Sequence, residues 1–427
     1  MRPWLIPMIY VGASVAAGLT VPRLEQGYGA SYRFDLAVAS AQAYLSAAAS
    51  GMMALTGIVF AMAFLMVQFS ALAYSPRLVL WFARDRGLFH ALGVFSATFM
   101  YALFTLAWTD RAGSGIVPLF SSLAVAVLLI ISMVLFTRLV QRLSDLQVTN
   151  VLHLIGDQGR QVIRDMFRRL DEGPTAPQAN LEANGGSVHL GPATQTLRYS
   201  GNPRIITTFD VPRLIRAAQQ ADGVIVMACA VGDTLTEDTV LLRIHGARAS
   251  ASDDDLMRAI RLDRERTFEQ DPKYPMRLLV EVAVRALSPA VNDPTTAVHT
   301  IDQIEDLLQR LGRRELDDGR VCDQDGVLRL IVPMTTWEDY LALGLDEIRQ
   351  YGVGSVQVMR RLRSALVALL ESAASEDRAQ TLRRYLARLD RTIERSLPDV
   401  EDRFFARQED RQGLGHSQRP SEVKELV

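Results

Sequence analysis

The 427-residue sequence is poor in lysine and cysteine, and each shortage excludes a class of chemistry. Lys273 and Lys424 are the only lysines; neither follows a glycine-rich phosphate loop, and neither lies in an apolar segment as a Schiff-base lysine would. Cys229 and Cys322 stand far apart, without partners at metal-ligand spacing. We therefore predict no metal site, no cofactor and no disulfide framework.

Charge is scarce in the first third of the chain. Residues 1–137 hold 7 arginines and 4 acidic residues, whereas the remaining 290 residues hold 39 basic and 44 acidic ones. The later part is slightly acidic, which argues against nucleic acid as a partner because phosphates require a broad basic surface. The first third is predicted to be a membrane domain whose partner is the lipid bilayer.

Four apolar runs reach the roughly 20 residues that a bilayer requires. We predict spans near residues 3–22, 49–71, 88–108 and 116–137; a signal peptide is the weaker alternative for the first. The second span lies in a longer charge-free run whose small-residue beginning is expected to pack on a neighbouring helix. The predicted fold class is an α-helical multi-pass membrane protein with a cytoplasmic α+β region, comprising a small β module and a helical domain.

Arginine positions predict the orientation, since loops rich in Arg and Lys stay in the cytoplasm. One side of the membrane receives six arginines and the opposite side three, which favours cytoplasmic N- and C-termini. The six are Arg2, Arg77, Arg84, Arg86, Arg138 and Arg142. The large region after the fourth span is then cytoplasmic, which suits its unpaired cysteines.

The last three spans contain no Asp, Glu, Lys or Arg. An ionisable group at mid-membrane is costly and normally marks an ion or proton relay, so a carboxylate-based pump is disfavoured. The polar residues Thr56, Gln68 and Ser70 are predicted to line a conduit; the alternative is that they bond to helix backbone or bridge helices. Small residues four apart, such as Gly57 and Ala61, fit a helix bundle or a homo-oligomer.

Beyond the spans, the pattern predicts a helical stalk at 138–170 and a Pro- and Gly-containing linker at 171–187. A small α+β module follows at 188–247. Residues 253–400 are predicted to form a mainly helical domain with one short hairpin, and 411–427 a disordered tail. These boundaries rest on changes of hydrophobic period and on turn residues.

Helix starts carry the clearest local signals. Asp210 followed by Pro212 predicts a helix at 211–221, because Asp is a good N-cap and proline suits the first turn. Three aspartates at 253–255 open another helix, where negative charge favours the positive end of the helix dipole. A calcium loop is the alternative there, but the central glycine of such a loop is missing.

The densest polar constellation surrounds the string Ser288-Pro289-Ala290-Val291-Asn292-Asp293-Pro294. Its structural interpretation is a tight turn in which Pro289 ends one helix and Asp293 caps the next. Its functional interpretation is a ligand or anion site at that helix start. The residues of this candidate site are Glu281, Arg285, Asn292, Asp293, Thr295, Thr296 and His299. No catalytic residue is assigned, because Ser288 lies in no recognisable nucleophile elbow.

Several strings are distinctive when they are taken together: residues 56–60, 68–70, 75–78, 84–87, 265–267, 270–271 and 286–294. With them, the chain resembles the family of predicted bacterial membrane proteins called domain of unknown function 2254, over roughly residues 1–400. The resemblance implies a multi-span protein of the bacterial inner membrane with a cytoplasmic domain. It carries over no activity, substrate or catalytic residue.

The leading functional hypothesis is a homo-oligomeric, channel-like or transport-related protein that its cytoplasmic domain gates or regulates. The first alternative is a membrane-anchored sensor or scaffold for an unidentified ion or small molecule, and the second is a membrane-bound hydrolase or transferase. Loss of ion flux on replacing Gln68 or Thr56 with leucine favours the conduit. Ligand binding near Asp293 in silent bilayers favours the sensor, and turnover abolished by His299→Ala favours the enzyme.

Overall fold

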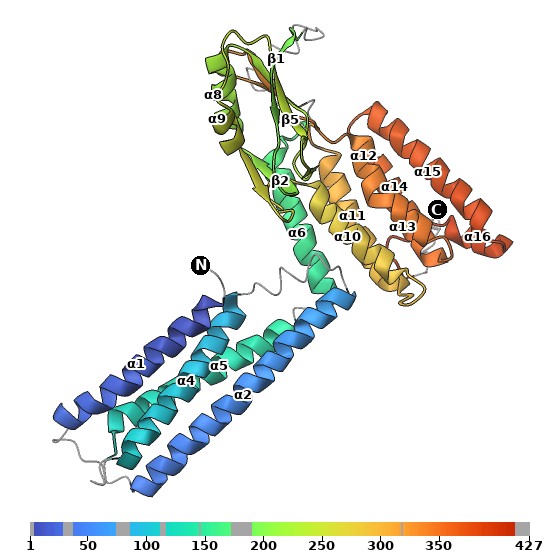
Figure 1. Cartoon of the computed structure of the whole chain (residues 1–427). Coiled ribbons are helices and arrows are strands. Elements are labelled where there is room, and N and C mark those ends of the chain that lie inside the picture. The colour runs from blue at the N-terminus through green and yellow to red at the C-terminus, as the bar shows by residue number, and fades with distance from the viewer. Residues whose placement is uncertain are drawn as a thin grey trace, which may run out of the picture. The chain divides into compact units, whose positions relative to one another are not determined.

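The computed structural model describes residues 4–28, 37–73, 86–111, 117–144, 147–171, 190–316 and 319–414. The chain forms two compact units, Met1–Val151 and Leu152–Val427 (Figure 1). The described part of the first unit consists almost entirely of long helices, and the second unit contains the sheets and shorter helices.

Long apolar helices make up the first unit: α1 (Leu5–Tyr28), α2 (Val38–Ala73), α4 (Arg86–Arg111) and α5 (Leu119–Ser144). Each has a stretch long and apolar enough to cross a membrane: Leu5–Glu25, Val38–Leu65, Gly87–Thr109 and Leu119–Gln141. The predicted four-span fold class is confirmed. The stretch in α2 begins at Val38, whereas the sequence places the span near 49–71, because the small-residue beginning belongs to the same continuous helix.

Helix α4 contacts α1, α2 and α5 and forms the centre of this unit. Gly93 permits the close approach of α4 to α1, since a Cβ atom there would lie 2.7 Å from Cδ2 of Tyr10. At the other end of α1, the Glu25 carboxylate accepts hydrogen bonds from the backbone N–H groups of Phe120 (2.7 Å) and Ser121 (3.2 Å). A carboxylate at the first turn of α5 complements the helix dipole.

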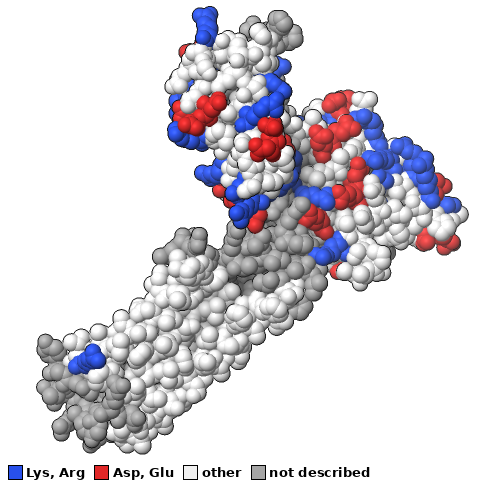
Figure 2. Space-filling view, in the orientation of Figure 1, with Lys and Arg blue, Asp and Glu red and all other residues white. Residues whose placement is uncertain are grey.

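On the face of the first unit that Figure 2 draws, the described residues carry almost no charged side chains. Phe120, Leu123, Ile130 and Met133 of α5 are among its large exposed side chains. A contiguous apolar surface of this kind is typical of contact with lipid or with another protein. The second unit differs, because acidic and basic side chains intermingle over its surface.

Two sheets form the β part of the second unit. A five-stranded sheet has the order β1-β5-β3-β8-β7, and a three-stranded sheet has the order β4-β2-β6. Strands β3 and β8 pair in parallel, with Ile225 opposite Leu330, and the other pairs are antiparallel. The strands are β1 (Ala193–Arg198), β2 (Arg204–Phe209), β3 (Val224–Met227), β4 (Thr234–Leu235), β5 (Val240–His245), β6 (Ile260–Asp263), β7 (Arg320–Cys322) and β8 (Leu328–Ile331).

Strands from both predicted modules share these sheets. The sequence ends the small module at 247, yet β6 pairs with β2 and the β7–β8 hairpin extends the larger sheet beside β3. Helix α8 (Val211–Ala221) begins and ends where the sequence predicts, and the side chain of Asp210 caps it. It packs with α9 (Asp253–Arg258), and Leu214 of α8 is fully buried in the core beside the sheets.

The remaining helices of the second unit are α6 (Val148–Met166), α10 (Lys273–Ala286), α11 (Pro294–Leu311), α12 (Trp337–Leu341), α13 (Glu347–Tyr351), α14 (Val356–Glu371), α15 (Glu376–Ser396) and α16 (Val400–Ala406), with a π-helical turn, η1 (Ala342–Asp346), between α12 and α13. In the predicted stalk, α6 packs on α11: a Cβ atom at Gly159 would lie 2.8 Å from the Leu307 side chain, and Arg160 pairs with Asp306 at 2.8 Å. The predicted linker from residue 172 and the predicted tail from residue 415 lie outside the described residues.

Candidate functional site

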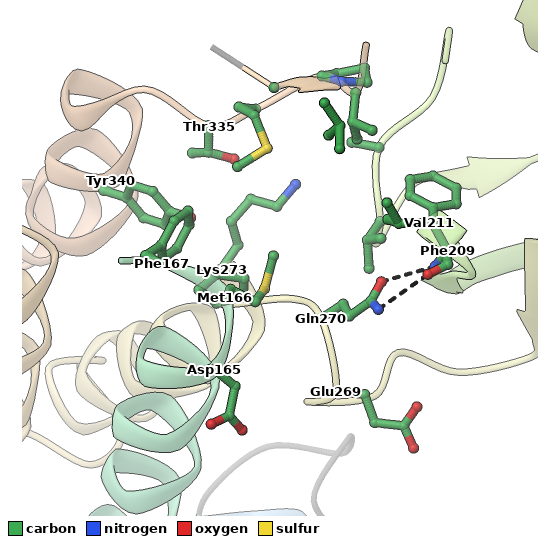
Figure 3. Close-up of a pocket in the computed structure, with 18 residues that line it drawn as sticks. Asp165, Met166, Phe167, Phe209, Val211, Glu269, Gln270, Lys273, Thr335 and Tyr340 are labelled. Carbon is green, nitrogen blue, oxygen red and sulfur yellow. Dashed lines mark hydrogen bonds between the residues drawn. The ribbon is translucent and has the colours of Figure 1, made fainter. Parts of the chain in front are cut away.

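A cavity of about 430 Å³ lies in the second unit, where the end of α6, the ends of β2 and β8 and the starts of α10 and α12 meet (Figure 3). Small-molecule sites usually measure about 300–1,000 Å³. We call it the Lys273 cavity after its lysine. Its lining residues are Asp165, Met166, Phe167, Phe209, Val211, Ala230, Val231, Glu269, Gln270, Pro272, Lys273, Gly319, Val321, Val332, Pro333, Met334, Thr335 and Tyr340.

Apolar side chains form most of the cavity wall. Met166 and Phe167 come from the end of α6, Val231 from the turn after β3, and Val332 and Met334 from the segment after β8. These residues are far apart in the sequence, so only the folded chain brings them together. A wall of this composition accepts the apolar part of a ligand.

Lys273 is the first residue of α10, and Figure 3 shows its side chain extending among the lining residues. The preceding Pro272 occupies the N-cap position and has no side chain that can accept a hydrogen bond from the helix. Lys273 is the only lysine that the structure describes. Among the described residues, no carboxylate oxygen lies within the 4.0 Å of an ion pair from its ammonium group.

Asp271 lies directly behind Lys273 and is only 1% exposed. Its Oδ1 accepts a hydrogen bond from the Lys273 backbone N–H over 3.1 Å, and its Oδ2 lies 3.6 Å from a guanidinium nitrogen of Arg266. Burial raises the pKa of Asp271, because the loss of water disfavours the carboxylate more than the charges of Lys273 and Arg266 favour it. The acid therefore sits in a poorly solvated interior beside the cavity.

Tyr340 contributes a phenol to the cavity wall and is 2% exposed. Burial raises the pKa of its hydroxyl, a hydrogen bond with the Thr335 side chain acts in the opposite direction, and the negative charge of Asp271 raises it further. The phenol is therefore neutral at physiological pH. Its hydroxyl and that of Thr335 are uncharged polar groups on the cavity wall.

Gln270 fixes the loop before α10 to the end of β2. Its carboxamide nitrogen donates to the backbone oxygen of Phe209 (3.3 Å), and its carboxamide oxygen accepts from the Phe209 N–H (2.9 Å), as the dashed lines in Figure 3 show. Side-chain bonds to both backbone groups of one residue substitute for strand pairing. They hold the loop that carries Lys273 against the sheet.

The two acidic lining residues, Asp165 and Glu269, are exposed and lie on the far side of the drawn residues from the Lys273 ammonium (Figure 3). Glu269 pairs with Arg261 at 3.4 Å. Within the described ranges, no group of three His, Cys, Asp or Glu side chains has an arrangement that holds a metal ion. The described lining residues thus form a mainly apolar wall with one basic side chain, Lys273.

None of the seven residues predicted around Asp293 lines the Lys273 cavity. Asp293 caps α11: its Oδ1 accepts from the Thr296 N–H at 3.1 Å and its Oδ2 from the Thr296 hydroxyl at 2.6 Å. Asn292 has a φ of 48° in the turn before α11. Thr295 and His299 are exposed on α11.

On the preceding helix α10, Glu281 accepts a hydrogen bond from Arg277 at 3.3 Å, and Arg285 lies near the end of the same helix. The structure therefore brings Asp293 and Thr296 together at the turn. The ligand or anion site at these residues stays a prediction.

The predicted conduit residues all lie on α2. The Thr56 hydroxyl donates to the Met52 carbonyl oxygen at 2.7 Å, so this half-buried side chain is bonded within its own helix. Gln68 is exposed. Ser70 is part of α2, but its side chain lies outside the described residues.

Comparison with known proteins identifies the family. The model of the family described as predicted membrane protein, domain of unknown function 2254, matches residues 2–368. The chain belongs to this family. An uncharacterized protein of Mycobacterium bovis and one of Mycobacterium tuberculosis are each 25% identical to it over 437 residues, covering 99% of this chain and 80% of theirs. No solved structure matches the chain.

Three of the strings that carry the family resemblance lie at or near the sites described above. Residues 286–294 form the turn between α10 and α11, and residues 265–267 with 270–271 belong to the loop that leads to Lys273. The sequence analysis missed Lys273 itself. Its local setting, Asp271-Pro272-Lys273-Tyr274, is polar, and the apolar residues around its side chain come from distant segments. The available signal was the rarity of lysine in a chain that otherwise uses arginine.

Proposed function

We propose that this membrane protein is an anchored ligand sensor. The four helices of the first unit hold it in a bilayer, and the second unit binds a small molecule in the Lys273 cavity. The observation that carries the proposal is a cavity of ligand size with an apolar wall and one cation. The sequence-based alternative of a non-conducting sensor is thus preferred to the conduit.

Hydrogen bonding within the membrane helices supports an anchoring role. Hydroxyl groups of these helices donate to the carbonyl oxygen four residues earlier: Thr56 to Met52, Thr98 to Val94, Thr105 to Tyr101, Ser122 to Pro118 and Thr137 to Met133. Hydroxyl donors that are satisfied by their own helix need no water-filled path. The second candidate function, a conduit, is favoured by one observation. Gln68 places an exposed carboxamide on α2.

The proposal includes a bacterial inner-membrane location with the second unit in the cytoplasm, as the arginine distribution predicts. It also includes a homo-oligomer formed through α2. Gly51, Ala54, Gly57 and Ala61 are exposed along this helix, and a Cβ atom at either glycine would meet nothing within 4 Å. Small residues on a membrane helix allow a second helix to approach closely.

A membrane-bound hydrolase or transferase that uses Asp293 and His299 has less support. Both carboxylate oxygens of Asp293 accept hydrogen bonds from Thr296, and His299 is exposed. This arrangement explains a helix cap without invoking proton transfer. The enzyme stays a prediction. Turnover by the wild type that is abolished in a His299→Ala variant would support it.

Amine labelling offers a direct test, because the chain has only two lysines. The full-length protein, in an uncharged sterol-based detergent, is acetylated, and mass spectrometry follows Lys273 and Lys424 separately. Three probes share a decyl chain: decanoate, decan-1-ol and decyltrimethylammonium. We expect at least one probe, at a concentration ten times its own dissociation constant, to slow acetylation of Lys273 about tenfold. Acetylation of Lys424 serves as the internal reference for the reactivity of the reagent.

Cavity-filling variants provide the control. Val231→Trp and Met334→Trp fill the cavity from two walls and should remove the effect of every probe on Lys273. Val327→Trp, at a half-exposed position in the hairpin turn that does not line the cavity, should behave as wild type. The sensor proposal fails if no probe protects Lys273 or if protection persists in both filled variants. Ion flux in liposomes that Gln68→Leu abolishes would instead support the conduit.

A further inference from the structure

We infer that the Lys273 cavity takes an amphipathic anion, with a single carboxylate or phosphate monoester as its head and an unbranched apolar chain as its body. This inference rests on the proposed ligand sensor and specifies the class of its ligand. Fatty acids and single-chain phosphates both combine one anionic head group with an apolar chain.

The ammonium of Lys273 specifies the charge of the head. It extends among apolar side chains, and no described carboxylate lies within ion-pair distance of it. Lys273 is partly buried, and a cation beside apolar walls gains more from a bound anion than a fully solvated cation does. Asp271 does not take this place, since its Oδ1 accepts from the Lys273 backbone and its Oδ2 faces Arg266.

The start of α10 adds to the same preference. Pro272 lines the cavity and occupies the N-cap of this 14-residue helix, and the Asp271 side chain accepts a hydrogen bond from the N–H of its first residue. The N-terminus of a helix carries positive partial charge and favours anions. The ammonium and the helix start therefore favour the same sign of charge.

The number of charges limits the head to one anionic group. Among the described residues, Lys273 is the only basic one that lines the cavity, and Asp165 and Glu269 are the acidic ones. A diphosphate or nucleotide needs several cations or a metal ion, and two carboxylates near the cavity edge repel it. One lysine suits one carboxylate or one phosphate monoester.

The choice of lysine over arginine also fits an alkyl ligand. Of the 46 basic residues in the chain, all but two are arginines. A guanidinium presents five donors in a rigid plane and needs several acceptors when it is buried, whereas an ammonium is compact and sits at the end of a flexible apolar stem. Lys273 thus lies alongside apolar walls and leaves the remaining space to the ligand.

The walls favour a flexible chain as the body of the ligand. Met166 at the end of α6 and Met334 in the segment after β8 contribute unbranched side chains to the wall. Val231 and Val332 contribute branched ones. Methionine adapts its shape to irregular apolar partners. The hydroxyls of Thr335 and Tyr340 are uncharged groups of the same wall and are hydrogen-bonded to each other.

The probes described above distinguish the head groups, with decyl phosphate as a fourth. We expect decanoate, decyl phosphate or both to slow acetylation of Lys273, and decan-1-ol and decyltrimethylammonium to have at most a tenth of their affinity. Tighter binding of decanoate indicates a fatty acid as the ligand class, and tighter binding of decyl phosphate indicates a single-chain phosphate. Equal protection by decan-1-ol overturns the anion inference and leaves the sensor proposal intact, whereas absence of protection by every probe defeats both.

Variants of Lys273 need a second readout, for which hydrogen exchange of the segments around Val231 and Thr335 serves. Lys273→Met keeps the length of the side chain and removes its charge, and it should weaken decanoate binding about tenfold or more. Lys273→Arg keeps the charge and should retain part of the affinity. If Lys273→Met binds decanoate as wild type does while remaining folded, the assignment of the head group to Lys273 is wrong.

Discussion

The carboxylate of Asp271 and the backbone N–H of Lys273 are joined by a hydrogen bond of 3.1 Å. One partner is buried, at 1% exposure, and the other sends its side chain into the cavity. The bond fixes the first residue of α10 and places a poorly solvated acid beside the single cation of the cavity. Substitutions at Asp271 therefore affect both the stability of the second unit and the position of Lys273.

Asp271→Asn should change the pH dependence of stability. The pKa of Asp271 is raised above its ordinary 3.8, mainly by burial. Its contribution to stability is therefore complete below that ordinary value and is lost as the pH rises through the raised pKa. Asparagine does not titrate, so the unfolding temperature of wild type minus that of the variant should fall as the pH rises across this window.

Thermal unfolding of both proteins over a pH series measures this difference. Asp325→Asn, at an exposed acidic residue, is the control for the removal of one acidic side chain from the second unit. A difference between wild type and Asp271→Asn that grows with rising pH would contradict the prediction, because it would mean that the folded state favours the carboxylate.

Asp323→Ala should destabilise the β7–β8 hairpin by about 3 kcal/mol. Asp323 is 5% exposed and accepts hydrogen bonds from Arg329 (2.9 Å), Gln219 (3.2 Å) and the backbone N–H groups of Val327 (3.0 Å) and Asp325 (3.1 Å). Burial acts to raise its pKa, but these hydrogen bonds outweigh burial and hold the pKa below its ordinary value.

The pH dependence has the opposite sign to that of Asp271. The Asp323 carboxylate stabilises the fold above its ordinary pKa, and this contribution is lost as the pH falls through the lowered pKa. The deficit of Asp323→Ala should therefore be largest at neutral pH and shrink on acidification. Circular dichroism melts at several pH values check it, with Asp325→Ala in the same turn as the control; a deficit independent of pH would reject the assignment.

Features that depend on neighbours in sequence could be predicted, and features that depend on long-range packing could not. Asp210 and Pro212 predicted the bounds of α8, because an N-cap acts over three residues. The four apolar runs predicted the membrane helices, because length and composition decide insertion. The pairing of β8 with β3 was not predictable, since it joins residues about a hundred positions apart.

The Lys273 cavity belongs to the second kind of feature. Its walls come from α6, the β3–β4 turn and the segment after β8, and no local pattern links them. The exclusion of lysine chemistry in the sequence analysis relied on the residues next to Lys273, which are polar, whereas the surroundings of a side chain are set by the fold. The constellation around Asp293 stood out because a helix end followed by a capped helix start concentrates polar residues in a short string.

Gly93→Ala should destabilise the first unit by about 1–3 kcal/mol. The added Cβ atom would lie 2.7 Å from the Tyr10 ring and 3.3 Å from the Pro7 backbone, so α1 and α4 would have to move apart. Gly12→Ala, on α1, is the matched control, because a Cβ atom there meets nothing within 4 Å. Alanine has the higher intrinsic helix propensity, so the control should lose no stability on thermal unfolding in detergent. Equal losses in both variants would contradict the assignment of the Gly93 effect to α1–α4 packing.

Asp293→Asn distinguishes a helix cap from a ligand or catalytic site. Asparagine caps a helix about as well as aspartate, so a structural role predicts an unfolding temperature close to that of wild type, whereas Asp293→Ala should lose about 0.5–2 kcal/mol. We expect this pattern, because both carboxylate oxygens bond to Thr296. Inorganic phosphate is the probe for the alternative: if phosphate raises the unfolding temperature of wild type but not of His299→Ala, an anion site at the start of α11 exists in addition to the cap.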